Sequence, residues 1–379
     1  MARHRLMGSF IRALAAVTPL LLASPAPRAA QAQVVAARLP DRLTDGEFWT
    51  LLSAISEPGG WFRIQDNFTS NEREIGQLYG MLRERGTTGG VYLGVGPEQN
   101  LTYIAAIRPQ MAFIVDIRRQ AVMQHLMFKA IFEMSADRAE FISLLFSKPR
   151  PAGLDSTTAI QAMWDAFWNV RTDSAMWVRN SASIVDHLTG TRGFGLTAEE
   201  VGQVRYVFES FFAFGPVIST RGMPGGGGAN SATFADLTGY SPDASGQPRS
   251  FLSSEDNFRF VKSLHARNLI VPVSGDFGGP KAIRAIGAWL AERRATVSAF
   301  YVSNVEQYLF QDGRAQAFYA NVRSLPVDAS SVFIRPYSLR RSGWSQNGVL
   351  VSLCPIASFL DSALSGRVLT NNDALACPQ

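Results

Sequence analysis

The chain has 379 residues, long enough for one large domain or two smaller ones, and its 46% hydrophobic content is typical of a globular protein with a sizeable core. The formal net charge of +5 arises almost wholly in residues 1–32, which hold four arginines and no acidic residue. The rest of the chain has 32 basic and 31 acidic residues. This balance argues against a nucleic-acid partner, which would need a clustered basic surface.

The N-terminus has the three parts of a secretory signal. Basic residues come first, an apolar run covers residues 13–23, and small residues continue to Ala30-Gln31-Ala32, an A-x-A cleavage pattern. We therefore predict a signal peptide over residues 1–32 and a periplasmic or secreted mature protein with no integral membrane segment. The alternative is an uncleaved membrane anchor, although the run is shorter than the about 20 residues that span a bilayer.

Both cysteines, Cys354 and Cys377, lie near the C-terminus. In an oxidising compartment, an even pair close in sequence favours a disulfide, which would tie down the tail over residues 354–379. The alternative is two unpaired thiols. Neither cysteine has a His or Cys neighbour at metal-ligand spacing, so no metal site is predicted.

Residues 33–134 are expected to hold two helices and the first half of an α/β domain. Asp45 is expected to cap the first helix, and Asn71 with Glu74 to form a capping box for the second. Alternating apolar runs and helical periodicity follow, and this strand–helix–strand–helix order is typical of a parallel sheet. The expected helices are 45–55, 71–85, 101–107 and 118–134, and the expected strands are 90–96 and 111–117.

Residues 135–213 are expected to form a helical insertion, and residues 214–353 the second half of the α/β domain. The two last apolar runs are short and close together, which predicts an antiparallel hairpin. We therefore expect a Rossmann-like α/β fold with a mostly parallel sheet, a C-terminal antiparallel hairpin and a helical insertion. The expected helices are 135–146, 156–170, 173–188, 197–212, 253–266 (capped by Ser253), 279–294 and 305–322; the expected strands are 215–219, 268–274, 296–302, 331–337 and 349–353, with a glycine-rich loop over 222–230.

Polar and glycine residues follow the expected strands at their carboxyl ends, where parallel sheets bind ligands. Gly94 and Gly96 permit a tight turn and a close approach of a ligand to the backbone. Asp116 ends the second strand, about 20 residues further on, where a carboxylate accepts hydrogen bonds from ribose hydroxyls. Together with Asn100 and Asp276, they form the predicted binding site for an adenosine-type cofactor.

The turn itself bears on which cofactor is bound. Pro97 has no N–H, whereas dinucleotide sites use the N–H groups of this turn to hold a pyrophosphate. This disfavours NAD and FAD and favours S-adenosylmethionine (SAM), which has no phosphate. Arg118 could instead pair with a 2′-phosphate, so an NADP-dependent enzyme remains an alternative.

Residues 90–98, 111–119 and the C-terminal hairpin resemble the core of class I SAM-dependent methyltransferases. More closely, Glu57-Pro58-Gly59-Gly60 and residues 94–100, 115–119 and 301–308 resemble an uncharacterised bacterial protein family, over most of the mature chain. The resemblance implies a methyltransferase-like fold, SAM as cofactor, and substrate-orienting side chains at Asn304 and Tyr308. Methyltransferases usually have an acid where this chain has Tyr92 and often a third glycine where it has Glu98.

Each predicted site residue also has a structural interpretation. Asp116, Asp276 and Asn304 could act as helix N-caps, and His125 is expected to pack in the core. No Ser/His/Asp or Cys/His set can be assembled, so no catalytic residue is predicted. Three hypotheses follow: a SAM-dependent methyltransferase, a non-enzymatic exported protein that binds a small molecule, and an NADP-dependent enzyme. Export favours the second, because SAM is made in the cytoplasm.

Overall fold

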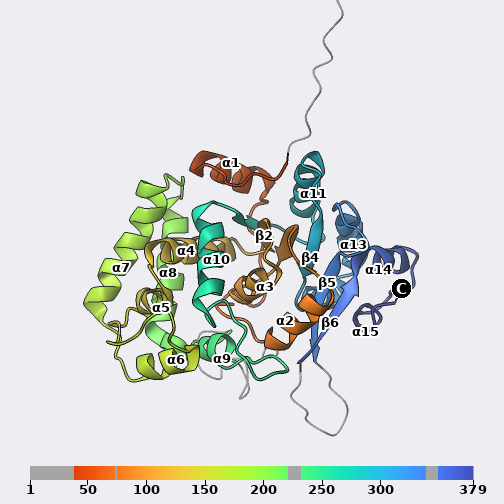
Figure 1. The fold of residues 1–379 in the computed structure, drawn as a ribbon. Helices are drawn as coiled ribbons and strands as arrows, with labels where there is room; N and C mark the ends of the chain where they lie inside the picture. The colour runs from red at the N-terminus through yellow and green to blue at the C-terminus, as the bar shows by residue number, and fades with distance from the viewer. Residues whose placement is uncertain (1–37, 73–74, 221–231, 339–348, 379) are drawn as a thin grey trace, which may run out of the picture. The chain divides into compact units, whose positions relative to one another are not determined.

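The computed structural model describes residues 38–72, 75–220, 232–338 and 349–378, and within them six strands form one sheet in the order β3-β2-β1-β4-β5-β6 (Figure 1). Strands β1 to β5 run parallel, and β6 runs antiparallel to β5. The predicted fold class, a mostly parallel α/β sheet closed by an antiparallel hairpin, is confirmed. The strands are β1 Val91–Gly94, β2 Met111–Asp116, β3 Ile270–Ser274, β4 Val297–Tyr301, β5 Val332–Ser338 and β6 Val349–Pro355.

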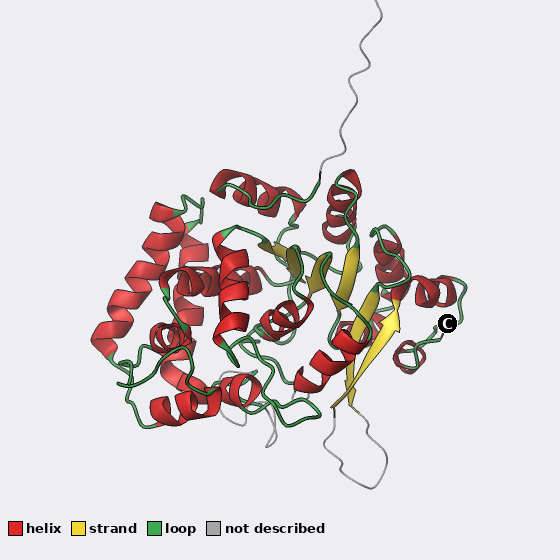
Figure 2. Ribbon diagram, in the orientation of Figure 1, coloured by secondary structure: helices red, strands yellow, loops and turns green. Residues whose placement is uncertain are grey.

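Helices cover both faces of the sheet, so its central strands are buried throughout. One group of helices that precede β3 in the chain covers one face, and the helices that follow β3 cover the other, together with α1 Asp45–Ile55 (Figure 2). The first group is α2 Ile75–Glu84, α3 Gln99–Ile107, α4 Arg119–Met134 and α10 Glu255–Ala266; the second includes α11 Ala282–Glu292, α12 Val305–Gln311, α13 Ala315–Arg323 and α14 Ile356–Leu364.

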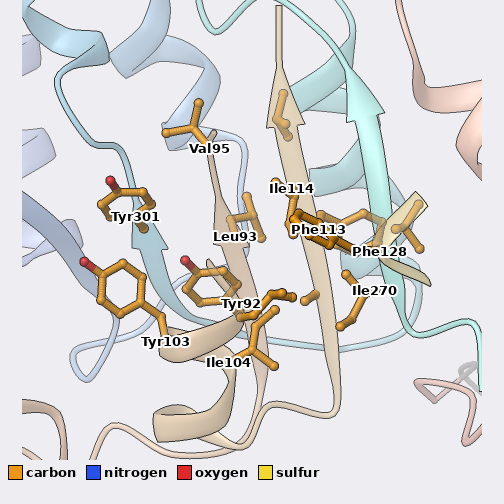
Figure 3. Close-up of a cluster of buried hydrophobic side chains, with 14 of the residues drawn as sticks. Tyr92, Leu93, Val95, Tyr103, Ile104, Phe113, Ile114, Phe128, Ile270 and Tyr301 are labelled. Atoms are coloured by element: carbon orange, nitrogen blue, oxygen red, sulfur yellow. The ribbon is translucent and has the colours of Figure 1, made fainter. Parts of the chain in front are cut away.

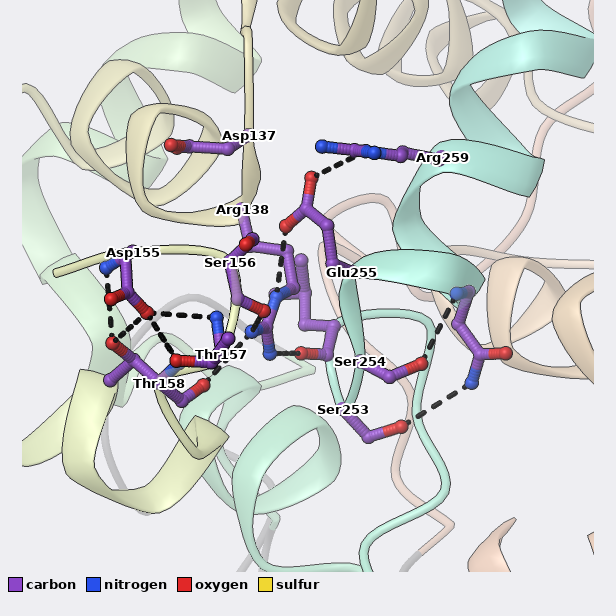
Figure 4. Close-up of polar contacts among 12 residues, drawn as sticks. Asp137, Arg138, Asp155, Ser156, Thr157, Thr158, Ser253, Ser254, Glu255 and Arg259 are labelled. Atoms are coloured by element: carbon purple, nitrogen blue, oxygen red, sulfur yellow. Dashed lines mark hydrogen bonds and ion pairs between the residues drawn. The ribbon is translucent and has the colours of Figure 1, made fainter.

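The predicted helical segment 135–213 is mostly helical, and a long loop over residues 147–159 interrupts it. Its elements are α5 Arg138–Phe146, α6 Ile160–Trp168, α7 Ser174–Asp186, a π-helical turn His187–Thr191 and α8 Ala198–Phe214. Arg138 joins this segment to α10 (Figure 4). Its guanidinium, in a side chain only 2% exposed, pairs with Glu255 at 3.2 Å and donates to the carbonyl oxygens of Leu252, Ser156 and Thr158 at 2.9–3.0 Å.

Several local predictions were wrong. The expected strand 215–219 is a 3₁₀ turn, Gly215–Val217, followed by a single bridge from Ser219 to Thr233; Pro216 lacks the N–H that a strand ladder needs. The expected helix 305–322 is two helices, broken at Gly313, which has a φ of 66°. Short helices were also missed, because they offer less than two turns of periodicity: α9 Phe234–Gly239 and α15 Asn371–Leu375.

Two predicted caps are displaced by one residue. Helix α1 (Asp45–Ile55) is capped by Thr44, which forms a capping box with Glu47, and α10 is capped by Ser254. In both helices the hydroxyl of the residue just before the first helical residue accepts from the N–H of the third helical residue, which is the geometry that a cap requires. The signal sequence, Glu74 of the expected capping box and the glycine-rich loop lie outside the described residues.

The predicted disulfide between Cys354 and Cys377 is confirmed, with Cα atoms 5.8 Å apart. It links the end of β6 to the segment after α15. A stable disulfide indicates a non-reducing compartment. Within the described ranges, no helix combines the length and apolarity needed to cross a bilayer.

We expect Arg138→Ala to lower the free energy of unfolding by about 3–5 kcal/mol, because it leaves buried carbonyl groups without a donor and removes a buried ion pair. Arg259 pairs with the same Glu255 but its side chain is 67% exposed, so Arg259→Ala should cost no more than about 0.5 kcal/mol. Urea unfolding of both variants tests this. Equal losses would show that the Arg138 contacts do not hold the helical segment.

Cys377→Ser should lower the free energy of unfolding by about 3 kcal/mol, since a crosslink over 23 residues restricts the unfolded chain. A reducing agent should destabilise the wild-type protein by a similar amount and leave the variant unchanged. Unfolding midpoints in urea, with and without the reductant, measure both effects. The prediction would be contradicted if the urea midpoint of the wild-type protein were the same with and without the reductant.

Candidate functional site

A cavity of about 490 Å³ opens at the carboxyl ends of β1, β2, β3 and β4. We call it the strand-end pocket. Its size suits a small-molecule ligand. The turns after the four strands and residues before α2 form its walls: residues 95–97 and Gln99 after β1, residues 116–118 after β2, Asp276 and Phe277 after β3, residues 303–305 and Tyr308 after β4, and residues 61–64, Asn67, Ser70 and Asn71.

Most of the predicted site residues meet in this pocket. Gly96, Asp116, Asp276, Asn304 and Tyr308 all line it, although they come from three turns, the end of β2 and one helix. The parallel strands bring them together, because their carboxyl ends lie at the same edge of the sheet. The geometric expectation that the glycine turn and the strand-end carboxylate share one cavity is therefore met.

Gly94 and Asn100 lie behind the pocket wall instead. Asn100 is fully buried, and its Nδ2 donates to the carbonyl oxygens of Val95, Gly96 and Pro97 at 2.7–3.1 Å, while its Oδ1 accepts from Tyr92. A Cβ at Gly94 would lie 1.9 Å from Asn100 Oδ1. These two residues thus shape the turn that forms the wall.

The turn is also held from α4. His125 Nε2 lies 2.9 Å from the Gly96 carbonyl oxygen. Burial lowers the pKa of His125, so the neutral ring donates its Nε2–H to that oxygen. Gly96 itself has a φ of 77°, which only glycine adopts readily. His125, which was expected to pack in the core, does so and fixes the turn as well.

Asp116 is paired with Arg118, the second residue after β2. Its Oδ1 accepts from the Arg118 backbone N at 2.9 Å and from Nε at 3.0 Å, and its Oδ2 accepts from Nη2 at 2.7 Å. A carboxylate has about four acceptor positions, so one on Oδ2 is left for a ligand. Helix α4 has no side-chain cap, so the interpretation of Asp116 as an N-cap is wrong.

Asp276 does not cap α11 either. Its carboxylate pairs with Arg314 and accepts from Gly278 N at 2.9 Å. Glu57, which lies far away in the sequence, caps α11 instead: its side chain accepts from Lys281 N at 3.0 Å and from Ala282 N at 2.9 Å. A sequence reading of α11 alone misses Glu57, because the two are more than 220 residues apart.

The motif over residues 57–60 positions the next residues, 61–64, at the pocket. A Cβ at Gly59 would lie 2.8 Å from Arg119, and one at Gly60 would lie 2.6 Å from Ile117, so both glycines permit close packing on the turn after β2. Gly60 N also donates to Ile117 O at 2.7 Å. The residues that follow, 61–64, therefore form one wall of the cavity.

Asn304 and Tyr308 occupy the opposite wall. Asn304 precedes α12 without a side-chain capping bond, so the capping interpretation is wrong and its exposed amide remains available to a ligand. The Tyr308 ring is covered by Arg63, whose guanidinium carbon lies 4.3 Å from the ring centroid, and meets the edge of Phe62. These contacts tie the two walls to each other.

A buried acidic group behind the β1–β4 wall was not predicted from the sequence. Glu72 accepts from Tyr301 at 2.7 Å and from Ser303 at 2.8 Å, and Glu98 accepts from Ser70 N at 3.1 Å. Burial raises the pKa of Glu72 to about 7 and that of Glu98 to about 8. Glu98 therefore lies behind the wall and does not fill the pocket. Three buried tyrosines interact with Glu72, and Figure 3 shows their rings: Tyr92, Tyr103 and Tyr301.

A second cavity of about 630 Å³ lies beside the N-terminus of α10. It is lined by Arg108 and Arg249, among others, which pair with Asp256 and Asp243. None of the predicted site residues reaches it. The described residues also hold no group of three or more His, Cys, Asp or Glu side chains placed to bind a metal ion.

The match to a protein family covers both halves of the sheet and most of the pocket. The family described as Domain of unknown function (DUF7790) matches residues 67–192 and 235–371, about two thirds of the chain. The chain belongs to the DUF7790 family. No curated protein matches it. The DUF7790 ranges contain Gly96, Asp116, Asp276, Asn304 and Tyr308, whereas residues 57–64 lie before them.

Glu98→Gln should change how the stability of this DUF7790 protein depends on pH. The pKa of Glu98 is about 8 in the folded protein, against an ordinary value of 4.5. The contribution of Glu98 to the free energy of unfolding is therefore fully present below about pH 4.5 and is lost as the pH rises through about 8. We therefore expect the variant to gain on the wild type between about pH 5.5 and 8.5, by up to a few kcal/mol. Urea unfolding at several pH values measures the difference.

The matched control is Glu199→Gln, since Glu199 is exposed in the first turn of α8. Its stability should follow the wild type across the same pH range. Parallel pH profiles of Glu98→Gln and the wild type would mean that Glu98 is ionised in the folded protein throughout.

Proposed function

We propose that the strand-end pocket binds an adenosine-containing small molecule, SAM or a related compound. The observation that carries this proposal is the meeting of Gly96 and Asp116 in one cavity of ligand size. The glycine lets a ligand approach the backbone, and the carboxylate has an acceptor position for a ribose hydroxyl. The pairing with Arg118 holds that carboxylate in one orientation, so little ordering is needed on binding.

The order of the strands suggests how such a ligand would lie. With the ribose at Asp116 on β2, the base would extend towards Asp276 and Phe277 beyond β3, and the 5′ substituent towards β1 and β4. Neighbouring strands are about 4.8 Å apart, so the ends of β3 and β4, three spacings apart, are separated by roughly 14 Å. That is the length of a nucleoside with a short chain.

The arginines near the pocket support this reading over an NADP-dependent enzyme. Arg118 is engaged by Asp116 and by Gln65 O, and Arg119 pairs with Glu200. A 2′-phosphate at this position would have to displace those partners. Pro97 also leaves the glycine turn one donor short for a pyrophosphate.

We further propose that the protein works after export, in the periplasm or outside the cell. The predicted signal peptide and the disulfide between Cys354 and Cys377 both support this. Binding without chemistry fits this location best, because SAM is made in the cytoplasm. Methyl transfer is the second candidate, supported by Asn304 and Tyr308 on the wall beyond β4.

Isothermal titration calorimetry of the mature protein with SAM and with adenosine tests the proposal. We expect both to bind, and Asp116→Asn to weaken binding about 10- to 100-fold, the value of a hydrogen bond to a charged group. Asp361→Asn is the control, because Asp361 lies in an exposed ion pair. This variant should bind both ligands as tightly as the wild type does. Circular dichroism checks that each variant is folded.

Absence of heat with either ligand at millimolar concentration would remove the proposed function. If folded Asp116→Asn binds both ligands as tightly as the wild type, the ribose does not contact Asp116 and the proposed position of the ligand is wrong.

A further inference from the structure

The β1–β4 end of the strand-end pocket presents hydrogen-bond acceptors. Gln99 and Ser303 both line the pocket there. Gln99 Nε2 donates to the Tyr301 hydroxyl at 2.6 Å, and this hydroxyl donates to Glu72 Oε2 at 2.7 Å. Ser303 Oγ donates to Glu72 Oε1 at 2.8 Å. The protons of both hydroxyl groups thus point towards one buried carboxylate.

This direction of the hydrogen bonds leaves two acceptors for a ligand. Because Ser303 uses its only proton on Glu72, it offers lone pairs to the pocket. Because Tyr301 also donates to Glu72, it can only accept from Gln99, which orients the amide with Oε1 on the other side. Gln99 is 3% exposed and its Oε1 has no hydrogen-bond partner. A buried acceptor without a partner is costly, so a donor from a ligand would stabilise it.

The group behind these acceptors is the buried carboxyl of Glu72, which is negative once it ionises. Within the described part of the chain, Glu72 forms no ion pair, although it is buried. The raised pKa of Glu72, about 7, follows from this burial. The titratable groups around it that the structure describes add no positive charge: Tyr92 on β1, Glu98 and Tyr103 at α3, and Tyr301 on β4.

We propose that this acceptor end, formed by Gln99, Ser303 and Glu72, binds a protonated amine of the ligand. The ammonium N–H groups donate to Gln99 Oε1 and Ser303 Oγ, and the Glu72 carboxylate is the counter-charge. A neutral alkyl group satisfies neither acceptor, and an anion is repelled. The inference deepens the proposed function and rests on it: the ligand class becomes adenosine with an aminoalkyl chain at its 5′ position.

Two probes that differ only in the ammonium group test this. They are 5′-(3-aminopropyl)thioadenosine and 5′-propylthioadenosine, titrated calorimetrically into the mature protein. We expect the amine to bind about 10- to 100-fold more tightly, as for hydrogen bonds to a charged group. Between about pH 6 and 8 this preference should grow, because Glu72 loses its proton and a cation then gains a counter-charge.

Glu72→Gln keeps the shape of the side chain but removes its charge and turns one acceptor into a donor. It should reduce the preference to less than about threefold, and abolish its pH dependence, while the affinity for the propyl probe stays unchanged. Glu199→Gln, an exposed change of the same kind, should keep the full preference. Should Glu72→Gln fail to fold, Ser303→Ala removes one acceptor and should lower the preference at least about threefold.

The outcomes separate this inference from the proposed function. Equal affinity for both probes in the wild type overturns the amine site and leaves adenosine binding intact. A preference that persists in folded Glu72→Gln overturns the role of the buried acid. No binding of either probe, nor of adenosine, removes both proposals together.

Discussion

The reversal of strand order at β1 and β4 is the constraint on which the rest of this structure depends. The chain builds β1, β2 and β3 in one direction, then returns to place β4 on the other side of β1. At such a switch point, the turns after neighbouring strands diverge and leave a crevice. Gly96 after β1 and Ser303 after β4 stand on its two sides. Every residue assigned to binding owes its position to this topology.

The fold could be predicted because its signals are local. The wholly apolar runs of β1 and β2 and the helical period of α4 are read directly from neighbouring residues. The glycine turn and Asp116 were found for the same reason, since each follows a strand. Asn100 was found too, but its role was not, because its amide stays within its own turn to bind three carbonyl oxygens.

The rest of the site depends on contacts between distant parts of the chain, which periodicity does not record. Glu57 caps α11 from more than 220 residues away, and Glu72 meets Tyr301 and Ser303 across a similar separation. Arg118 shows the same limit at short range. Its spacing from Asp116 allowed either a phosphate contact or an ion pair, and only the fold selects the ion pair.

The buried polar groups behind the β1–β4 wall differ from those of a well-packed interior, because they reduce the stability of the protein. An uncompensated carboxyl such as Glu72 lowers stability relative to an apolar residue of similar size, and the orphan Oε1 of Gln99 adds to that cost. Sequences commonly break the rules of packing where a ligand is to be bound, because the partner that satisfies these groups arrives with the ligand. Both costs fall beside one end of one cavity, whereas Asn100, at the start of α3, uses its amide on the backbone carbonyl groups of the adjoining turn. That contrast within a few residues supports the proposal that Gln99 meets a ligand and that Asn100 belongs to the scaffold.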